Sequence, residues 1–354
     1  YGACQNAFDP DFISGGSSSG SAVAVASGCA TFSLGTDTAG SGRVPAGFNN
    51  LVGLKPTPSR MSTHGVLPAC RSLDCVSVFA LTTGDAARVL AVADGLREGE
   101  AVFNPHRPGP ARLPRALKVG VPTSAIFSGD AAYEAAFASA CERVRALHDL
   151  DGSAWPVTVT PVDLAPFYEV ARLLYEGPWV AERHAAIDTF IQRQPESVHP
   201  VVRGIIEQAS RYSAVDTFQA QYRLRALASQ LAAVWHDIDV LMVPTAPTHP
   251  TVDSVLAEPA GFTAVGGTSL PPVAWPQTVV VVKVRKPAGG LGGHAFGGGE
   301  QGFGGSDDWG NPVSGGDFGG DDDGVGFELN DQYGGEEKKN DDDVPMAEPK
   351  EVKQ

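Results

Sequence analysis

Apolar residues follow two patterns along the first two thirds of the chain. In several stretches they recur at helical spacing, with prolines near 195 and 200 as breaks. These stretches predict helices over 85–96, 130–147, 164–193 and 201–235. A further helix of small residues is predicted to start with residues 22–26. Short apolar runs predict strands at 31–34, 116–121, 157–162 and 238–243. Because strands alternate with helices, we predict an α/β fold with a central mixed or parallel sheet flanked by helices.

The end of the chain differs sharply in composition from the rest. Residues 286–354 hold 19 glycines, 16 acidic residues and 5 lysines or arginines. The remaining 285 residues carry 25 acids and 21 bases, so most of the net charge of −15 belongs to this tail. Such a segment buries too little apolar area to offset its ordering entropy, so we predict a disordered acidic tail. Its spaced aromatic residues also suit self-association, but a solvated tail is the simpler interpretation.

We therefore divide the chain into a globular region over 1–259, an irregular connection over 260–285 and the tail over 286–354. The globular region is nearly charge-balanced and offers no basic face for nucleic acid. No stretch reaches the ~18 apolar residues of a membrane span, so we expect no membrane partner either. The five cysteines are loosely spaced and form no metal-binding spacing with the histidines, which indicates reduced thiols, a cytoplasmic location and no metal or other cofactor.

A Gly/Ser loop over 15–21 (GGSSSGS) is the first stretch that could carry chemistry. As a phosphate loop it lacks the following Gly-Lys-Ser/Thr, and no strand leads into it. Residues 16–20 fit the Gly-x-Ser-x-Gly of a nucleophile elbow, but that motif needs a hydrophobic strand directly before it. A flexible linker fits poorly too, because a small-residue helix begins directly afterwards. The loop does supply hydroxyls and N–H groups at a helix N-terminus, where developing negative charge is favoured.

A second stretch of small residues, 35–46 (GTDTAGSGRVPA), places Ser41 in a tight turn. The N–H groups just before Ser41 can point at a carbonyl oxygen bound there, which is the geometry of an oxyanion hole. Taken alone, such a stretch is more often just a turn. The two stretches lie 24 residues apart, from Ser17 to Ser41.

The paired stretches resemble the central block of the amidase signature family, and the similarity continues through 53–57 (GLKPT). The resemblance implies an α/β amidase-signature core, here incomplete at both ends, that hydrolyses a small amide substrate. It implies a Ser–Ser–Lys triad, in which Ser41 is the nucleophile and Ser17, held by a cis peptide, bridges it to a lysine. The oxyanion donors that it implies are the backbone N–H groups of Thr38, Ala39, Gly40 and Ser41.

Two further stretches, 65–77 (GVLPACRSLDCVS) and 175–183 (YEGPWVAER), resemble the allophanate hydrolase branch of this family. This resemblance implies hydrolysis of allophanate to ammonia and carbon dioxide through an acyl-enzyme on Ser41. It also implies that Tyr175 and Arg183 hold the substrate carboxylate, and an arginine fork suits a carboxylate bidentately. The alternative for Arg183 is a surface ion pair with Glu182 or a nearby acid. The branch further implies a urea carboxylase as partner or fused domain, and it is compatible with a homo-oligomer.

The chain departs from the family pattern in two places. The triad lysine is expected several tens of residues before the Gly/Ser loop, whereas the chain starts 16 residues before Ser17. Lys55 belongs to the GLKPT segment, and His64, the nearest histidine, suits a loop position better than a replacement base. The family's closing segment is replaced by 260–285 and the tail. We therefore expect little amidase activity from the chain by itself; the alternative is a silent remnant that binds a partner through its acidic tail.

Overall fold

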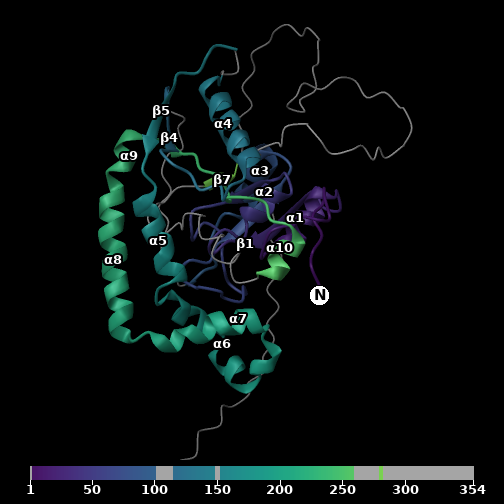
Figure 1. Ribbon diagram of the computed structural model, residues 1–354, viewed down its shortest axis with the longest axis vertical. Helices are drawn as coiled ribbons and strands as arrows, with labels where there is room; N and C mark the ends of the chain where they lie inside the picture. Colours follow the sequence, from purple (N-terminus) through teal and green to yellow (C-terminus); the bar gives the residue numbers. More distant parts are fainter. Residues whose placement is uncertain (1, 101–114, 148–151, 259–278, 282–354) are drawn as a thin grey trace, which may run out of the picture. The chain divides into compact units, whose positions relative to one another are not determined.

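The strands of the described residues form two sheets. The computed structural model describes residues 2–100, 115–147, 152–258 and 279–281 (Figure 1). Helices flank the sheets, so the predicted α/β class is confirmed. One sheet is antiparallel, in the order β1 (Phe32–Thr36), β3 (Val76–Ala80), β2 (Val52–Lys55) and β7 (Val279–Val281). The other is parallel, in the order β5 (Val157–Val162), β4 (Leu117–Pro122) and β6 (Val240–Leu241).

The long connections carry helices, which is what lets β4, β5 and β6 run parallel. After β4 the chain passes through a helix before it returns as β5, and several more helices precede β6. The helices of the described residues are α1 (Ser19–Ala26), α2 (Val44–Phe48), α3 (Thr83–Ala93), α4 (Ala131–Arg145), α5 (Ala165–Tyr175), α6 (Trp179–Arg193), α7 (Pro200–Ile206), α8 (Ala214–Ala232), α9 (Val234–Asp237) and α10 (Val252–Ala257), with 3-10 turns at Pro195–Ser197 and Glu207–Arg211.

The two inner strands of the antiparallel sheet, β2 and β3, are buried on both faces. Every residue of β2 and β3 is buried, and successive side chains of a strand point to opposite faces. Val78 belongs to an apolar cluster with Leu90 of α3, whereas the next residue, Phe79, belongs to another with Val25 of α1. Strands that are buried on both faces show no apolar–polar alternation. For this reason the sequence predicted neither β2 nor β3.

The small-residue helix α1 lies along the outer edge of β1. Ser18, directly before the helix, donates its hydroxyl to the Thr36 carbonyl and accepts from the Thr36 N–H, both at 3.2 Å. Ser21 donates to the Leu34 carbonyl at 2.9 Å. These hydroxyls satisfy backbone groups that an edge strand would otherwise leave unpaired. The Gly/Ser loop is thereby held beside the end of β1.

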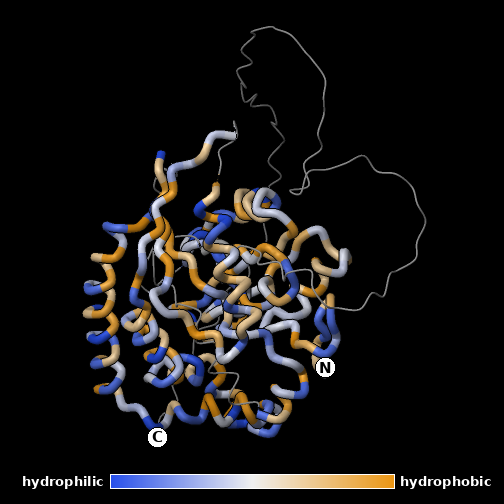
Figure 2. Tube along the Cα trace, turned by 45° about the horizontal axis from the view of Figure 1, so that its top comes forward, coloured by the Kyte–Doolittle hydropathy of each residue, from blue (hydrophilic) through white to orange (hydrophobic). Residues whose placement is uncertain are grey.

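The parallel sheet packs against α5 and α8. Phe167 of α5, Leu227 and Leu231 of α8, and Ile238 before β6 share one apolar cluster. The hydropathy colouring alternates between orange and blue along α8, the helix at the left edge, as expected for a helix with one buried face (Figure 2). A capping box formed by Ser213 and Asp216 begins this helix.

Both long helical stretches are more divided than predicted. Residues 164–193 form α5 and α6, separated at Gly177 and Pro178. A Cβ at Gly177 would lie 2.2 Å from the Leu173 carbonyl oxygen, so only glycine fits at this corner. Residues 201–235 form most of α7, a 3-10 turn, α8 and part of α9. The corner at Gly177 matters for the site, because it folds α6 back beside the end of α5.

The remaining predictions concern the ends of the chain and its compartment. Residues 279–281, predicted within an irregular connection, form β7 against β2. The predicted tail over 286–354 and most of 260–285 lie outside the described residues. All five cysteines are free thiols. Across the described ranges, no helix combines the length and the hydropathy that crossing a membrane requires.

Candidate active site

Ser41 lies in a tight turn between β1 and α2, which we call the Ser41 turn (residues 37–42). The Asp37 N–H donates to the Cys75 carbonyl at 2.7 Å, which extends the pairing of β1 with β3 to the start of the turn. The Arg43 N–H donates to the Gly40 carbonyl at 2.9 Å and leads the chain into α2. Gly40 has a φ of 125°, which residues with a Cβ rarely adopt. The turn predicted around Ser41 is therefore present.

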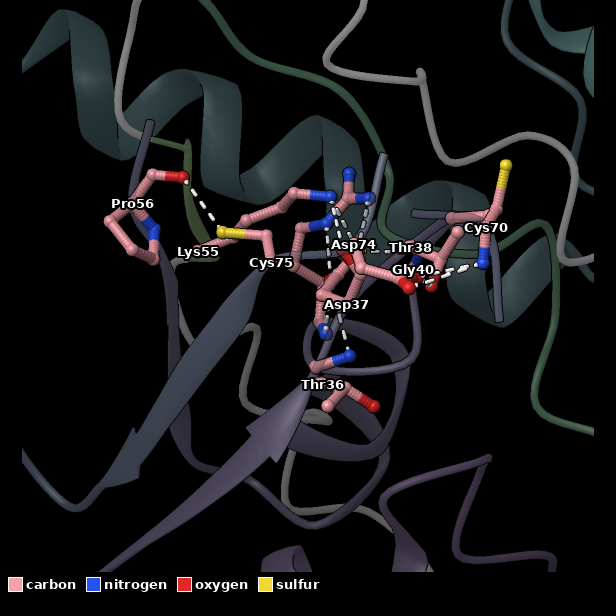
Figure 3. A network of polar contacts seen from close by, with 12 residues as sticks. Thr36, Asp37, Thr38, Gly40, Lys55, Pro56, Cys70, Asp74 and Cys75 are labelled. Carbon is pink, nitrogen blue, oxygen red and sulfur yellow. Dashed lines mark hydrogen bonds and ion pairs between the residues drawn. The ribbon is translucent and has the colours of Figure 1, made fainter. Parts of the chain in front are cut away.

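The carboxylate of Asp37 holds this turn together. It accepts hydrogen bonds from the N–H groups of Gly40 at 2.8 Å, Gly42 at 3.1 Å and Arg43 at 3.1 Å. The Arg43 guanidinium donates to the same carboxylate at 2.9 and 3.0 Å. Lys55, the last residue of β2, donates to the Asp37 carbonyl at 2.5 Å and to its carboxylate at 2.9 Å. Figure 3 shows Asp37 at the centre of these contacts.

The three side chains form a buried cluster of one negative and two positive charges. Burial by itself would raise the pKa of Asp37, but Arg43 and Lys55 outweigh that effect and hold the pKa well below its usual range. The carboxylate is therefore ionised, whereas burial and the nearby Arg43 lower the pKa of Lys55.

Three backbone N–H groups of the turn have no acceptor among the described residues, namely those of Thr38, Ala39 and Ser41. Four N–H groups were expected as oxyanion donors. That of Gly40 is not available for this role, because it already donates to the Asp37 carboxylate. Gly40 shapes the turn through its φ value, and the other three N–H groups can face a carbonyl oxygen.

The peptide bond between Gly16 and Ser17 is cis, as the family resemblance implies. Ser17 is exposed, and Ser41 is half-buried. The hydrogen bonds of Ser18 to Thr36 keep this loop beside the strand that enters the Ser41 turn. Neither the Ser17 nor the Ser41 hydroxyl makes a hydrogen bond with any other described residue. The bridging role of Ser17 therefore stays a prediction.

Tyr175 and Arg183 lie beside the same turn, although they are more than 130 positions away in sequence. The Tyr175 hydroxyl donates to the Ala39 carbonyl at 3.4 Å. The Arg183 guanidinium carbon lies 6.0 Å from the centre of the Tyr175 ring, within cation–π range. Arg183 Nε is buried and has no hydrogen-bond partner among the described residues. The corner formed by residues 175–183, which we call the α5–α6 corner, thus brings to the Ser41 turn a donor that no described residue occupies.

The alternative for Arg183, an ion pair with Glu182 or another acid, is absent from the described residues. Glu182 accepts hydrogen bonds from Ser72 instead. Burial raises the pKa of Tyr175, although the nearby arginines oppose the shift. Tyr175 therefore carries its proton at neutral pH and can act as a donor.

Sequence reasoning overlooked the part that Asp37, Arg43 and Lys55 play at the site. The signal that could have found them is a charged residue that stands alone in an uncharged or apolar stretch of the sequence. Asp37 is the only acid within residues 25–73, and Lys55 lies in an otherwise apolar run over 51–56. A charged residue in such surroundings must be paired if it is buried. An acid and two bases within 19 residues therefore point to one shared cluster.

His64, the nearest histidine considered as a replacement base, is exposed and contacts the guanidinium of Arg97. It lines a cavity of about 370 Å³ whose walls include Arg71, Asp74 and Glu100 but neither serine of the site. Over the described residues, no group of histidine, cysteine and acidic side chains could hold a metal ion.

Comparisons with known proteins agree on one family. The family described as Amidase matches residues 1–284 of the chain. The urea amidolyase of Saccharomyces cerevisiae is 40% identical over 272 residues, which cover 76% of this chain and 14% of that protein. The allophanate hydrolase of Kluyveromyces lactis superposes with a TM-score of 0.71 at 38% identity, covering 77% of this chain and 44% of that one. The urea amidolyase of the same yeast gives a TM-score of 0.70 and is covered over 16% of its length. The chain thus spans less than half of each of these relatives.

Proposed function

Because the chain belongs to the amidase family, we propose that it forms the amide-cleaving part of an allophanate hydrolase. The observation that carries the proposal is the position of Arg183. A guanidinium with a buried nitrogen that has no hydrogen-bond partner among the described residues lies beside the turn that bears Ser41. Allophanate combines an amide with a carboxylate, so one molecule can offer its carbonyl to the turn and its carboxylate to Arg183.

In the proposed reaction Ser41 attacks the terminal carbamoyl carbon of allophanate. The oxygen of that carbonyl gains negative charge, which the N–H groups of Thr38, Ala39 and Ser41 stabilise. The proton of Ser41 passes to Ser17, which hands its own proton on to the family's lysine. The same path returns a proton to the amide nitrogen, ammonia leaves, and water then releases the acyl group from Ser41.

We propose that recognition comes from the α5–α6 corner. The planar fork of Arg183 can donate two hydrogen bonds to a carboxylate. The neutral Tyr175 hydroxyl can donate a third if it turns from the Ala39 carbonyl to the ligand. A neutral amide offers no negative charge to Arg183, so it should bind more weakly than an anionic one of the same size.

The direct test is ammonia release from allophanate by the 354-residue chain and by the longest polypeptide that its gene encodes. We expect Ser41→Ala to abolish release, because the other hydroxyl of the turn, that of Thr38, is bound to the Asp74 carboxylate. Serine-dependent release only by the longer polypeptide would mean that the lysine comes from outside these 354 residues. Serine-dependent release by the chain at the rate of a complete homologue would overturn the expectation that the chain alone is nearly inactive.

A catalytically silent remnant that binds a partner through its acidic tail is the second candidate. It is favoured by one observation, namely that no lysine of the described residues contacts Ser17. If no polypeptide from this gene releases ammonia in a Ser41-dependent way, this candidate replaces the first.

We also propose a urea carboxylase as the fused domain or partner, in a cytoplasmic protein that forms homo-oligomers. Its support is that the S. cerevisiae relative is named urea amidolyase and is far longer than this chain. Sequencing the complete transcript and measuring the mass of the purified protein in solution test these statements.

A further inference from the structure

We infer that Glu182 is a positioning residue that holds the α5–α6 corner in register with the Ser41 turn. This inference rests on the proposed function only for the roles of Tyr175 and Arg183. Glu182 is the neighbour of Arg183 on α6, but it points its carboxylate at a different part of the chain, the loop formed by residues 69–74.

The carboxylate of Glu182 binds this loop through three donors. It accepts from the Ser72 N–H at 2.7 Å, from the Ser72 hydroxyl at 2.6 Å and from the Cys70 thiol at 3.0 Å. Hydrogen bonds to an ionised acceptor are roughly twice as strong as neutral ones. Burial raises the pKa of the Cys70 thiol, and the bond to Glu182 raises it further, so the thiol keeps the proton that it donates. Glu182 thus fixes the loop to the first turns of α6.

The same loop is fixed to the Ser41 turn by Asp74. The Thr38 hydroxyl donates to the Asp74 carboxylate at 2.5 Å, and Thr38 is one of the proposed oxyanion donors. Asp74 also accepts from the N–H groups of Ala69 at 3.0 Å and Cys70 at 3.1 Å. Figure 3 shows Asp74 close to both Thr38 and Cys70. The Asp74 carboxylate therefore joins the loop to the Ser41 turn, and the Glu182 carboxylate joins the loop to the α5–α6 corner.

Apolar packing fills the space between the three segments. Cys70 and Leu73 of the loop form one buried cluster with Leu174 at the end of α5, and Ala39 and Tyr175 pack against it. Because the cluster draws on the loop, the turn and the corner, a shift of the loop must move the other two segments. The distance between Arg183 and the N–H groups of the Ser41 turn is then set by Glu182, which touches neither the substrate nor Ser41.

The test compares Glu182→Gln with wild type in the full chain. Glutamine keeps the size of the side chain but removes the charge and replaces one accepting oxygen by a donor. Ser72→Ala is the second variant, because it removes one contact to Glu182 without altering α6. Glu169→Gln is the matched control, since Glu169 of α5 pairs with Arg223 on the surface and does not contact the loop.

The first measurement is amide hydrogen exchange, which needs no activity. In Glu182→Gln we expect about tenfold faster exchange in peptides covering 38–41 and 69–74, with a smaller increase in Ser72→Ala. Glu169→Gln should leave both peptides unchanged. Unchanged exchange in Glu182→Gln would overturn the inference, whatever the substrate turns out to be.

The second measurement is binding of two probes to the Ser41→Ala background by calorimetry. Malonamate has a methylene in place of the NH of allophanate and keeps the carboxylate, and malonamide is its neutral counterpart. Glu182→Gln should lower the preference for malonamate over malonamide by about tenfold, the equivalent of ~1.4 kcal/mol. An unchanged preference would also overturn the inference. If the Ser41→Ala protein with Glu182 intact binds both probes equally, the allophanate proposal fails, and exchange in the Ser41 turn alone decides the role of Glu182.

Discussion

The Ser41 turn and the α5–α6 corner meet at one site but are held by different interactions. The turn is held by a buried carboxylate between two buried cations. The corner is held by apolar packing, by one hydrogen bond from Tyr175 and by the contacts of Glu182. Removing one partner of a buried ion cluster leaves an uncompensated charge. Arg183, by contrast, has a nitrogen with no hydrogen-bond partner in the part of the chain that the structure describes. Changes in the turn should therefore act on folding, and changes in the corner should act on ligand binding.

The largest expected effect is that of Asp37→Asn. The change leaves Arg43 and Lys55 buried without their counter-charge, and it weakens three hydrogen bonds from the turn. We expect the free energy of unfolding in urea to fall by about 3–5 kcal/mol, or folding to fail. The control is Asp188→Asn on α6, an exposed acid that accepts from Gln192, which should cost less than about 0.5 kcal/mol. Equal stability of the two variants would contradict this account of the turn.

Acid should remove the stability that the buried Asp37 carboxylate gives the turn. Because the folded pKa of Asp37 is lowered, its stabilising contribution is complete above its unfolded pKa of about 3.9 and is lost as the pH falls toward the folded pKa. We expect urea unfolding measured from pH 7 to pH 3 to show stability falling below about pH 5. In Lys55→Met one cation is missing, so the folded pKa lies nearer the unfolded one and the fall should be shallower. A steeper fall in that variant would contradict the assigned cause.

Arg183→Lys should act on the ligand and leave folding alone. The change keeps the charge but loses the planar fork, so we expect malonamate affinity to drop by about 1–3 kcal/mol. The free energy of unfolding should stay within about 0.5 kcal/mol of wild type. Arg172→Lys, on the exposed side of α5, is the matched control for both measurements. Full affinity in Arg183→Ala would remove the allophanate assignment and leave a general amidase.

The smallest expected effect is that of Tyr175→Phe, which concerns the contact between the two regions. The hydrogen bond to Ala39 is long at 3.4 Å, and the ring stays in the apolar cluster. We expect losses of about 0.5–1.5 kcal/mol in malonamate affinity, measured by the same calorimetry. A loss larger than that of Arg183→Lys would make Tyr175 the principal carboxylate ligand.

Much of the parallel half of the fold could be predicted from the sequence. The strand over 157–162 and the helix starting after Asp130 match β5 and α4. Both could be predicted because hydrophobic periodicity and helix capping depend on residues close together in the sequence. The antiparallel half was harder to predict. β2 and β3 are short, buried on both faces and contain a glycine or a serine, so neither alternation nor length distinguishes them from loops.

The sequence by itself determined the family resemblance, the Ser41 turn and the pair of serines, because these depend on residues close together along the chain. Only the tertiary structure decided that Asp37 occupies the Gly40 N–H and leaves those of Thr38, Ala39 and Ser41 without an acceptor among the described residues. It also decided the role of Glu182, whose partners lie 110 and 112 positions away. Such contacts depend on how separate elements pack, and packing joins residues whose separation in sequence carries no periodic signal.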